Sequence, residues 1–198
     1  MHTRIFHIGE QNTETVVEAV GSSLKSAGVC IIPTDTLYGL VAIDRFTEAV
    51  ERIYRIKRRP AHMPFIRLVG CLEAVARYTS QQVPQRLLRF WPGPLTIVFA
   101  SKRGGTVSIR YPDDAFLQSI FTSIDFDVLV APSANITGCE NIIQCEDLLS
   151  TFRGKVDTIV CRKEGPVRSR PSTIIDISTS NWKILRKGDI EVELPSEE

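Results

Sequence analysis

Small polar side chains follow two short apolar runs of this chain. In VCIIPTDTLYGL, a proline after four apolar residues introduces Thr34, Asp35 and Thr36. In VLVAPSANITG, a proline again precedes Ser133 and Asn135. Either stretch alone has the composition of a plain turn. Ligands of open α/β sheets bind beyond the carboxyl ends of strands, so two such strand ends together predict a polar binding site.

Three consecutive cations, Lys57, Arg58 and Arg59, end a predicted helix between these two stretches. Cations at a helix C-terminus are favoured by the helix dipole, so a simple cap is one interpretation. Three cations exceed what a cap needs, and Lys57 and Arg59 are expected at an exposed helix end from which both reach one polyanion. Arginine suits forked phosphate contacts and lysine suits point contacts, so the pair indicates phosphate binding.

Several common kinds of catalytic site are not indicated by the sequence. Ser133 does not stand in a G-x-S-x-G elbow, and His2, His7 and His62 have no evident catalytic partner. These observations argue against a serine hydrolase. The sequence has neither a P-loop nor a G-x-G-x-x-G motif, so a nucleotide must be held in another way.

The composition is typical of a soluble globular protein with one domain. The chain has 198 residues and a formal net charge of +1, so its net charge indicates no particular partner. No apolar run approaches the roughly 20 residues that span a bilayer, and the start has no signal-peptide h-region. The five cysteines form no C-x-x-C pair, which argues against a disulfide framework and a zinc site. We expect one cytoplasmic domain over residues 1–198, in a reducing compartment and with no membrane segment.

Helical and strand patterns alternate in the first half of the chain, and strands crowd the second half. Helices are predicted over residues 12–28, 47–60, 71–79, 84–91, 114–124 and 145–154. Strands are predicted over residues 29–32, 65–69, 94–100, 106–111, 127–131, 156–160, 172–177 and 182–186. The stretch CRKEGPVRSRP, residues 161–171, is predicted to be a loop. This pattern predicts an α/β fold with a mixed sheet.

Seven stretches, taken together and in order, resemble the YrdC/TsaC family of threonylcarbamoyl-AMP synthases. They are PTDTLYGL, KRRP, WPGPLT, SIRYPDD, APSANITG, RPSTIID and ILRKGD. The K-x-R and S-x-N pairs of the family are present as Lys57, Arg59, Ser133 and Asn135. The resemblance implies a twisted, open mixed sheet of the YrdC-like type with flanking helices. It also implies the short, single-domain form of the family.

The resemblance implies a nucleotidyltransferase that condenses L-threonine, bicarbonate and ATP to threonylcarbamoyl-AMP and pyrophosphate. The product feeds the t6A modification of tRNA next to the anticodon, so downstream t6A transfer proteins are implied partners. Mg²⁺ would arrive with ATP, with no metal ligand assigned to the protein, and tRNA is implied only as a weak direct ligand. Several negative charges converge in this reaction, so cations must offset their repulsion.

The family match also implies roles for individual residues. The catalytic residues would be Lys57, Arg59, Ser133 and Asn135. Threonine would be bound by Thr34, Arg110, Ser133 and Thr173, with Arg110 on its carboxylate. ATP would be bound by Lys57, Arg59, Thr106, Asn135 and Arg186.

Several positions depart from the family pattern, including CRK, residues 161–163, in place of the usual DGG. Met63 stands where a basic or amide residue is common, and Leu68 stands where some members place a histidine on threonine. Ile143 replaces a nucleotide-binding hydroxyl. These departures leave open a paralogue that keeps the fold but not the activity, although the K-x-R and S-x-N residues argue against it.

A second alternative is an RNA-binding module. It would use the basic residues Arg52, Arg55, Lys57, Arg58, Arg59 and Arg67. Salt-sensitive tRNA binding without ATP turnover would favour this alternative.

Overall fold

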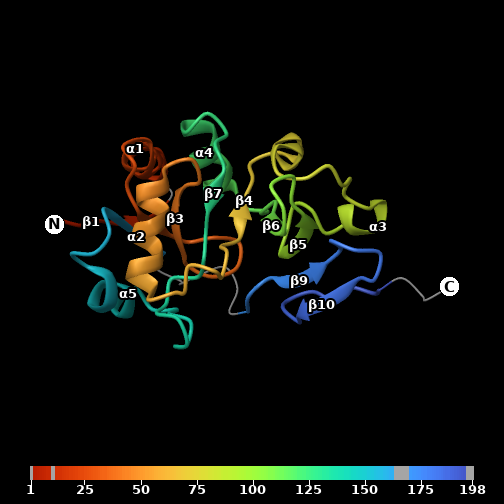
Figure 1. The fold of residues 1–198 in the computed structure, drawn as a ribbon. Coiled ribbons are helices and arrows are strands. Elements are labelled where there is room, and N and C mark those ends of the chain that lie inside the picture. Colours follow the sequence, from red (N-terminus) through yellow and green to blue (C-terminus); the bar gives the residue numbers. More distant parts are fainter. Residues whose placement is uncertain (1, 10–11, 163–169, 195–198) are drawn as a thin grey trace.

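The computed structural model describes residues 2–9, 12–162 and 170–194 (Figure 1). Most of the predicted 161–171 loop therefore lies outside the described residues. The helices are α1 (Thr13–Lys25), α2 (Thr47–Lys57), α3 (Gln85–Leu88), α4 (Ala115–Ser123) and α5 (Cys145–Phe152), with a 3₁₀-helix η1 (Leu72–Arg77). The strands are β1 (Arg4–Ile8), β2 (Cys30–Ile32), β3 (Gly39–Ile43), β4 (Arg67–Leu68), β5 (Leu95–Ala100), β6 (Thr106–Arg110), β7 (Leu129–Val130), β8 (Thr158–Arg162), β9 (Thr173–Asp176) and β10 (Lys183–Arg186).

All of these strands belong to one open, mixed sheet. Their order is β1-β8-β2-β3-β7-β4-β6-β5-β9-β10, and Figure 1 shows the sheet crossing the molecule from β1 near the N-terminus to β10. Strand β8 pairs in parallel with both β1 and β2, whereas β2 and β3 pair antiparallel. The predicted α/β fold with an open mixed sheet and flanking helices is therefore confirmed.

The strands near the N-terminus are covered by helices on both faces because their side chains alternate between the faces. Ile32 and Val41 pack in one cluster with residues of α1 and α4. Ile31 and Leu40 pack in a second cluster with residues of α2 and α5. A third cluster lies under β5, β6 and β9 and includes residues of η1 and α3. The first two clusters fix the turn between β2 and β3, from which the PTDTLYG side chains project.

Two strands were not predicted. Strand β1 is an edge strand whose side chains are exposed or half-buried, and its sheet partner β8 is far along the chain. Strand β3 begins inside the PTDTLYGL stretch at Gly39, and all five of its residues are buried. The predicted helix over residues 71–79 is the 3₁₀-helix η1, and the helix over 84–91 shortens to α3.

The cysteines also differ from the expectation, because Cys145 and Cys161 form a disulfide. Their Cα atoms lie 5.6 Å apart, since the first turn of α5 packs over β8. These two cysteines are 16 residues apart in the sequence and are brought together by the fold. Among the described residues, no helix is both long and apolar enough to cross a membrane.

Candidate active site

The two polar strand ends predicted from the sequence lie side by side. Gly39 and Ser133 form an isolated antiparallel bridge. The Leu40 N–H donates to the Pro132 carbonyl at 2.9 Å, and the Ala134 N–H donates to the Tyr38 carbonyl at 2.7 Å. The two loops are therefore held together by backbone hydrogen bonds.

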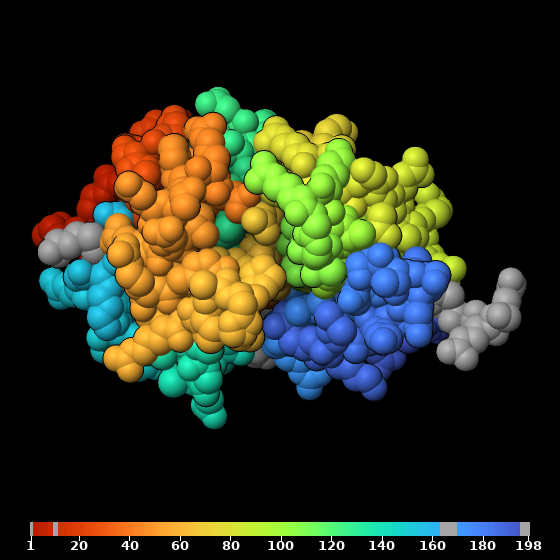
Figure 2. All heavy atoms as spheres, in the orientation of Figure 1, coloured from red at the N-terminus to blue at the C-terminus, as the bar shows by residue number. Residues whose placement is uncertain are grey.

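A cavity of about 290 Å³ opens where these loops meet. It is lined by Thr34, Thr36, Leu37, Tyr38, Gly39, Ile66, Arg110, Ala131, Ser133, Asn141, Pro171, Ser172 and Arg186. In Figure 2, the orange to yellow segment after α2 and the blue C-terminal segment meet along a seam in the middle of the molecule. Both segments supply lining residues, namely Ile66 from the first and Arg186 from the second.

The PTDTLYG turn is ordered by its own side chains. The Thr34 hydroxyl donates to the Leu37 carbonyl at 2.7 Å and accepts from the Thr36 N–H at 3.1 Å. The Thr36 hydroxyl oxygen accepts a hydrogen bond of 2.8 Å from Arg110 Nη1. These short polar residues thus replace backbone pairing within the turn and connect it to β6.

Arg110 lies at the end of β6 and forms a buried ion pair with Asp35. Its Nη2 is 3.1 Å from Asp35 Oδ1, and both side chains are less than a tenth exposed. Burial lowers the pKa of Arg110, although Asp35 and Asp114 oppose this shift. Neither Asp35 oxygen accepts a hydrogen bond within the described chain, and Arg110 Nε donates none. Arg110 therefore has donor capacity left for an anionic ligand.

A second cation, Arg186 of β10, reaches the same cavity. Its Nε donates to the Ser172 carbonyl at 2.9 Å, and its Nη2 donates to the Ser172 hydroxyl at 3.0 Å. Burial and the nearby Arg110 lower the pKa of Arg186. Asp35 balances the charge of Arg110, so Arg186 supplies the additional positive charge of the described lining. Both guanidinium groups suit carboxylates and phosphates.

Lys57 is buried, which corrects the expectation of an exposed helix end. Its side chain lies behind the 133–139 loop, where Nζ donates to the Ser133 carbonyl at 2.6 Å. It also donates to the Asn135 carbonyl at 2.7 Å and to Asn135 Oδ1 at 3.0 Å. Burial, assisted by Arg59, lowers the pKa of Lys57 to about 8. These three acceptors explain how a lysine is accommodated in the interior.

Asn135 connects Lys57 with the cavity wall. Its Oδ1 also accepts a hydrogen bond of 2.7 Å from the Ser133 hydroxyl, and its Nδ2 donates to the Cys139 carbonyl at 2.6 Å. Lys57, Ser133 and Asn135 therefore form one hydrogen-bonded group. Within this group Lys57 and Asn135 support Ser133, and Ser133 lines the cavity.

Arg59 begins the segment after α2, because Arg58 takes the left-handed conformation that ends the helix (φ 52°). Its guanidinium donates to the carbonyls of Met63 and Pro64 and lies 5.5 Å from the centre of the Phe65 ring. It is half-buried and does not belong to the lining of the 290 Å³ cavity. Its predicted contact with ATP stays a prediction.

The sequence of this chain matches a known family over most of its length. The profile of the Sua5/YciO/YrdC domain, described as telomere recombination, matches residues 22–188. The chain belongs to this family.

Relatives named threonylcarbamoyl-AMP synthase are similar to nearly all of this chain. A threonylcarbamoyl-AMP synthase of Pyrococcus abyssi is 29% identical over 203 residues, which cover 96% of this chain and 59% of the relative. A putative threonylcarbamoyl-AMP synthase of Methanocaldococcus jannaschii is 28% identical over 203 residues, which cover 96% of this chain and 94% of the relative. The chain thus spans somewhat more than half of the Pyrococcus protein.

Solved structures of family members share the fold. The crystal structure of P. abyssi Sua5 complexed with L-threonine superposes with a TM-score of 0.84 and 28% identity. This match covers 94% of this chain and 58% of that one. E. coli YciO superposes with a TM-score of 0.79 at 21% identity, covering 94% of this chain and 96% of that one, which shows the fold alone.

The structure brings four of the family-derived site residues to the cavity. They are Thr34, Arg110, Ser133 and Arg186. The Thr173 hydroxyl instead donates to the Ile190 carbonyl, and its neighbour Ser172 lines the cavity. Leu68, at the position where some family members place a histidine, lies in the core cluster of α1 and α4. The nearby Ile66 lines the cavity instead.

Thr106 lies outside the lining, at the other end of β6. It points to the same face of the strand as Ser108 and Arg110, because alternate residues share a face, while Val107 and Ile109 are buried. At roughly 3.3 Å per residue, Thr106 is about 13 Å from Arg110 along the strand. A long ligand that leaves the cavity along β6 would reach it.

Sequence reasoning assigned no role to Asp35 or Asn141. Asp35 carried a signal, since an acidic residue between two threonines at a buried strand end needs a cationic partner. Asn141 carried none, because its place at the cavity depends on the path of the loop before α5. The described lining contains no carboxylate.

Proposed function

We propose that this chain is a threonylcarbamoyl-AMP synthase that makes threonylcarbamoyl-AMP and pyrophosphate from L-threonine, bicarbonate and ATP. The observation that carries the proposal is a cavity between two polar strand ends that combines two cations, Arg110 and Arg186, with several hydroxyl groups. It is supported by the resemblance to P. abyssi Sua5, whose structure contains L-threonine. The nucleotidyltransferase class follows from the transfer of an adenylyl group.

In the proposed reaction, the threonine amine and bicarbonate combine to a carbamate with loss of water. A carbamate oxygen then attacks the α-phosphorus of ATP, and pyrophosphate leaves. No covalent nucleophile is needed from the protein, because orientation and charge stabilisation supply most of the rate. Arg110 would hold the threonine carboxylate, and Arg186, Arg59 and the group around Lys57 would offset the phosphate charges.

Mg²⁺ is proposed to accompany ATP and to take its oxygen ligands from the phosphates. This assignment fits the described part of the cavity lining, which provides hydroxyl groups but no carboxylate. The proposal places the protein in the cytoplasm, where ATP and tRNA occur. Its product would be passed to t6A transfer proteins, and tRNA would be a weak direct ligand.

The proposed activity is tested by pyrophosphate release from ATP. We expect release that requires both threonine and bicarbonate, because neither alone forms the attacking carbamate. Omitting each substrate in turn supplies the control. Release of ADP and phosphate, or turnover that does not depend on threonine, would refute the proposed reaction.

Amino-acid selectivity should follow the hydroxyl groups of the cavity. Thr34, Thr36, Ser133 and Ser172 all line it, so the substrate hydroxyl is expected to be hydrogen-bonded. Valine lacks that hydroxyl and should be rejected by roughly 10⁴-fold, because buried polar groups would be left unpaired. Serine lacks only a methyl group, which should cost about 1–3 kcal/mol. Specificity constants at saturating ATP and bicarbonate should therefore fall from threonine to serine to valine, and equal values for serine and valine would contradict a hydroxyl-lined pocket.

The predicted contact between Thr106 and ATP can be separated from threonine binding. Thr106→Ala should raise KM for ATP several-fold, since one hydrogen bond is typically worth about 1 kcal/mol, and should leave KM for threonine unchanged. Ser119→Ala, an exposed hydroxyl on α4, is the matched control. An unchanged KM for ATP in Thr106→Ala would show that the nucleotide does not follow β6.

A further inference from the structure

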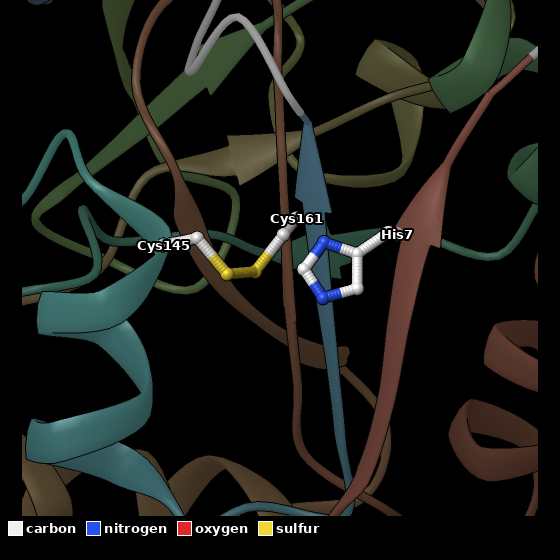
Figure 3. A group of neighbouring side chains, drawn as sticks. All are labelled: His7, Cys145 and Cys161. Carbon is white, nitrogen blue, oxygen red and sulfur yellow. A yellow bond between two sulfur atoms is a disulfide. The ribbon is translucent and has the colours of Figure 1, made fainter.

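Three side chains of metal-binding types meet on one face of the sheet, and none of them lines the cavity as described. His7 of β1 and Cys161 of β8 are register partners in the parallel pair of strands. Cys145 approaches them from the first residue of α5. One ligand atom from each of the three lies within 4.8 Å of the other two. Figure 3 shows the imidazole of His7 turned toward the two sulfur atoms.

The alternation of the strands explains why these side chains point the same way. Phe6 and Ile8 pack toward the cluster of α1 and α4, so His7 points to the opposite face, where α5 lies. Val160 likewise packs with α1 and α4, whereas Cys161 belongs to the cluster of α2 and α5. The convergence is therefore fixed by the backbone of both strands.

Two thiolates and one imidazole, with a fourth tetrahedral position, are a ligand set that suits zinc. We propose that the reduced form of this protein binds one zinc ion through His7, Cys145 and Cys161. Three protein ligands leave the fourth tetrahedral position for water. The positive charge of the ion would balance the two thiolates, of which that of Cys161 is buried.

The disulfide and the metal site are two states of the same cysteines. In the disulfide both sulfurs are joined, so neither is a thiolate ligand. A phosphine reductant breaks the S–S bond and takes oxygen from water, while each sulfur gains a proton. Zinc binding then releases both protons. A reducing cytoplasm, as proposed above, would favour the dithiol, but the metal site does not depend on the proposed enzymatic reaction.

The geometry requires little change of the backbone. Two Zn–S bonds of about 2.3 Å at a tetrahedral angle place the sulfurs roughly 3.8 Å apart. The Cα atoms of Cys145 and Cys161 are already 5.6 Å apart, so side-chain rotation can produce this separation. His7 is exposed and Cys145 is half-buried, which gives the ion access from solvent.

The experiment measures metal binding by the full chain after phosphine reduction. Co²⁺ is the spectroscopic probe, since tetrahedral thiolate coordination gives sulfur-to-cobalt charge-transfer bands and intense visible bands. Zn²⁺ affinity follows from competition with a chromogenic chelator. We expect one ion per reduced chain and none in the oxidised chain.

Variants distinguish this site from other cysteines and histidines. His7→Ala should weaken Zn²⁺ binding by at least about tenfold, because the loss of a residue that only hydrogen-bonds to a metal ligand already costs that much. The variant should also change the visible bands of bound Co²⁺. Cys145→Ser should weaken binding further and remove one sulfur from the charge-transfer band. The controls are His62→Ala and Cys139→Ser, both exposed and outside the cluster, which should bind like the unaltered chain.

His7 is an exposed edge-strand residue, so His7→Ala is expected to fold even if Cys145→Ser does not. Failure of the reduced chain to bind Co²⁺ or Zn²⁺ would overturn the proposal. Unchanged affinity and bands in His7→Ala, or undiminished binding in a folded Cys145→Ser variant, would overturn it as well.

Discussion

Replacing Lys57 by methionine should remove most of the activity and also destabilise the protein. Methionine keeps the apolar stem but loses the ammonium group, which donates to two carbonyls and to Asn135 Oδ1. Hydrogen bonds that involve a charged group are worth about 1.5–3 kcal/mol each, so we expect a loss of about 3 kcal/mol or more in the free energy of unfolding. Turnover should fall by roughly 100-fold or more because Ser133 and Asn135 lose their support.

Urea unfolding and pyrophosphate release would measure the two effects on the same samples. Arg58→Ala is the matched control, because Arg58 is exposed and directly follows Lys57. Residue 58 has a left-handed backbone, and neither arginine nor alanine has the conformational freedom of glycine there. It should change stability by no more than about 0.5 kcal/mol. A Lys57→Met variant as active and as stable as the unaltered chain would mean that the buried ammonium does not hold the 133–139 loop.

Arg110→Gln should weaken threonine binding and destabilise the fold through a different route. The substitution leaves the buried carboxylate of Asp35 without its cation, and breaking a buried ion pair in this way typically costs about 3–5 kcal/mol. Loss of a charge-assisted hydrogen bond to the substrate carboxylate should weaken binding by about 10- to 100-fold. Denaturant unfolding and threonine calorimetry report these two losses separately.

The double variant Asp35→Asn with Arg110→Gln separates folding from binding. It removes both buried charges, so we expect most of the lost stability to return, as in a double-mutant cycle for coupled residues. Threonine binding should stay weak, because the cation is still missing. A double variant that binds threonine normally would show that Arg110 is not the carboxylate site, and one as unstable as Arg110→Gln would show that the two residues are not coupled.

The elements that could be predicted are those with a local pattern of apolar and polar residues. Helices α1 and α2 have apolar stripes with helical spacing. Strand β5 is a buried run of strand-forming residues, and in β6 the apolar Val107 and Ile109 alternate with polar residues. The unpredicted strand β1 has no such signal, since its residues are at most half-buried and its pairing comes from β8. Strand β3 is apolar throughout but directly follows the polar turn, so no change in composition marks its start at Gly39.

The candidate site shows the same division between local and distant information. The polar composition of the two strand ends is local, and the two ends lie side by side, with Thr34 and Ser133 lining one cavity. The burial of Lys57 depends on carbonyls of Ser133 and Asn135, which no helix-end pattern contains. The disulfide between Cys145 and Cys161 likewise depends on how α5 packs on β8.

The position of β8 has a consequence for protein synthesis. Thr158 pairs with both Arg4 and Cys30, so β8 is the strand that joins β1 to β2. On the ribosome the N-terminus emerges first, and β1 and β2 must wait for most of the chain before their common neighbour appears. Pairings between such distant segments form slowly, and unpaired strand edges favour association with other chains. The nascent protein is therefore expected to be most prone to aggregation just before residues 158–162 leave the exit tunnel.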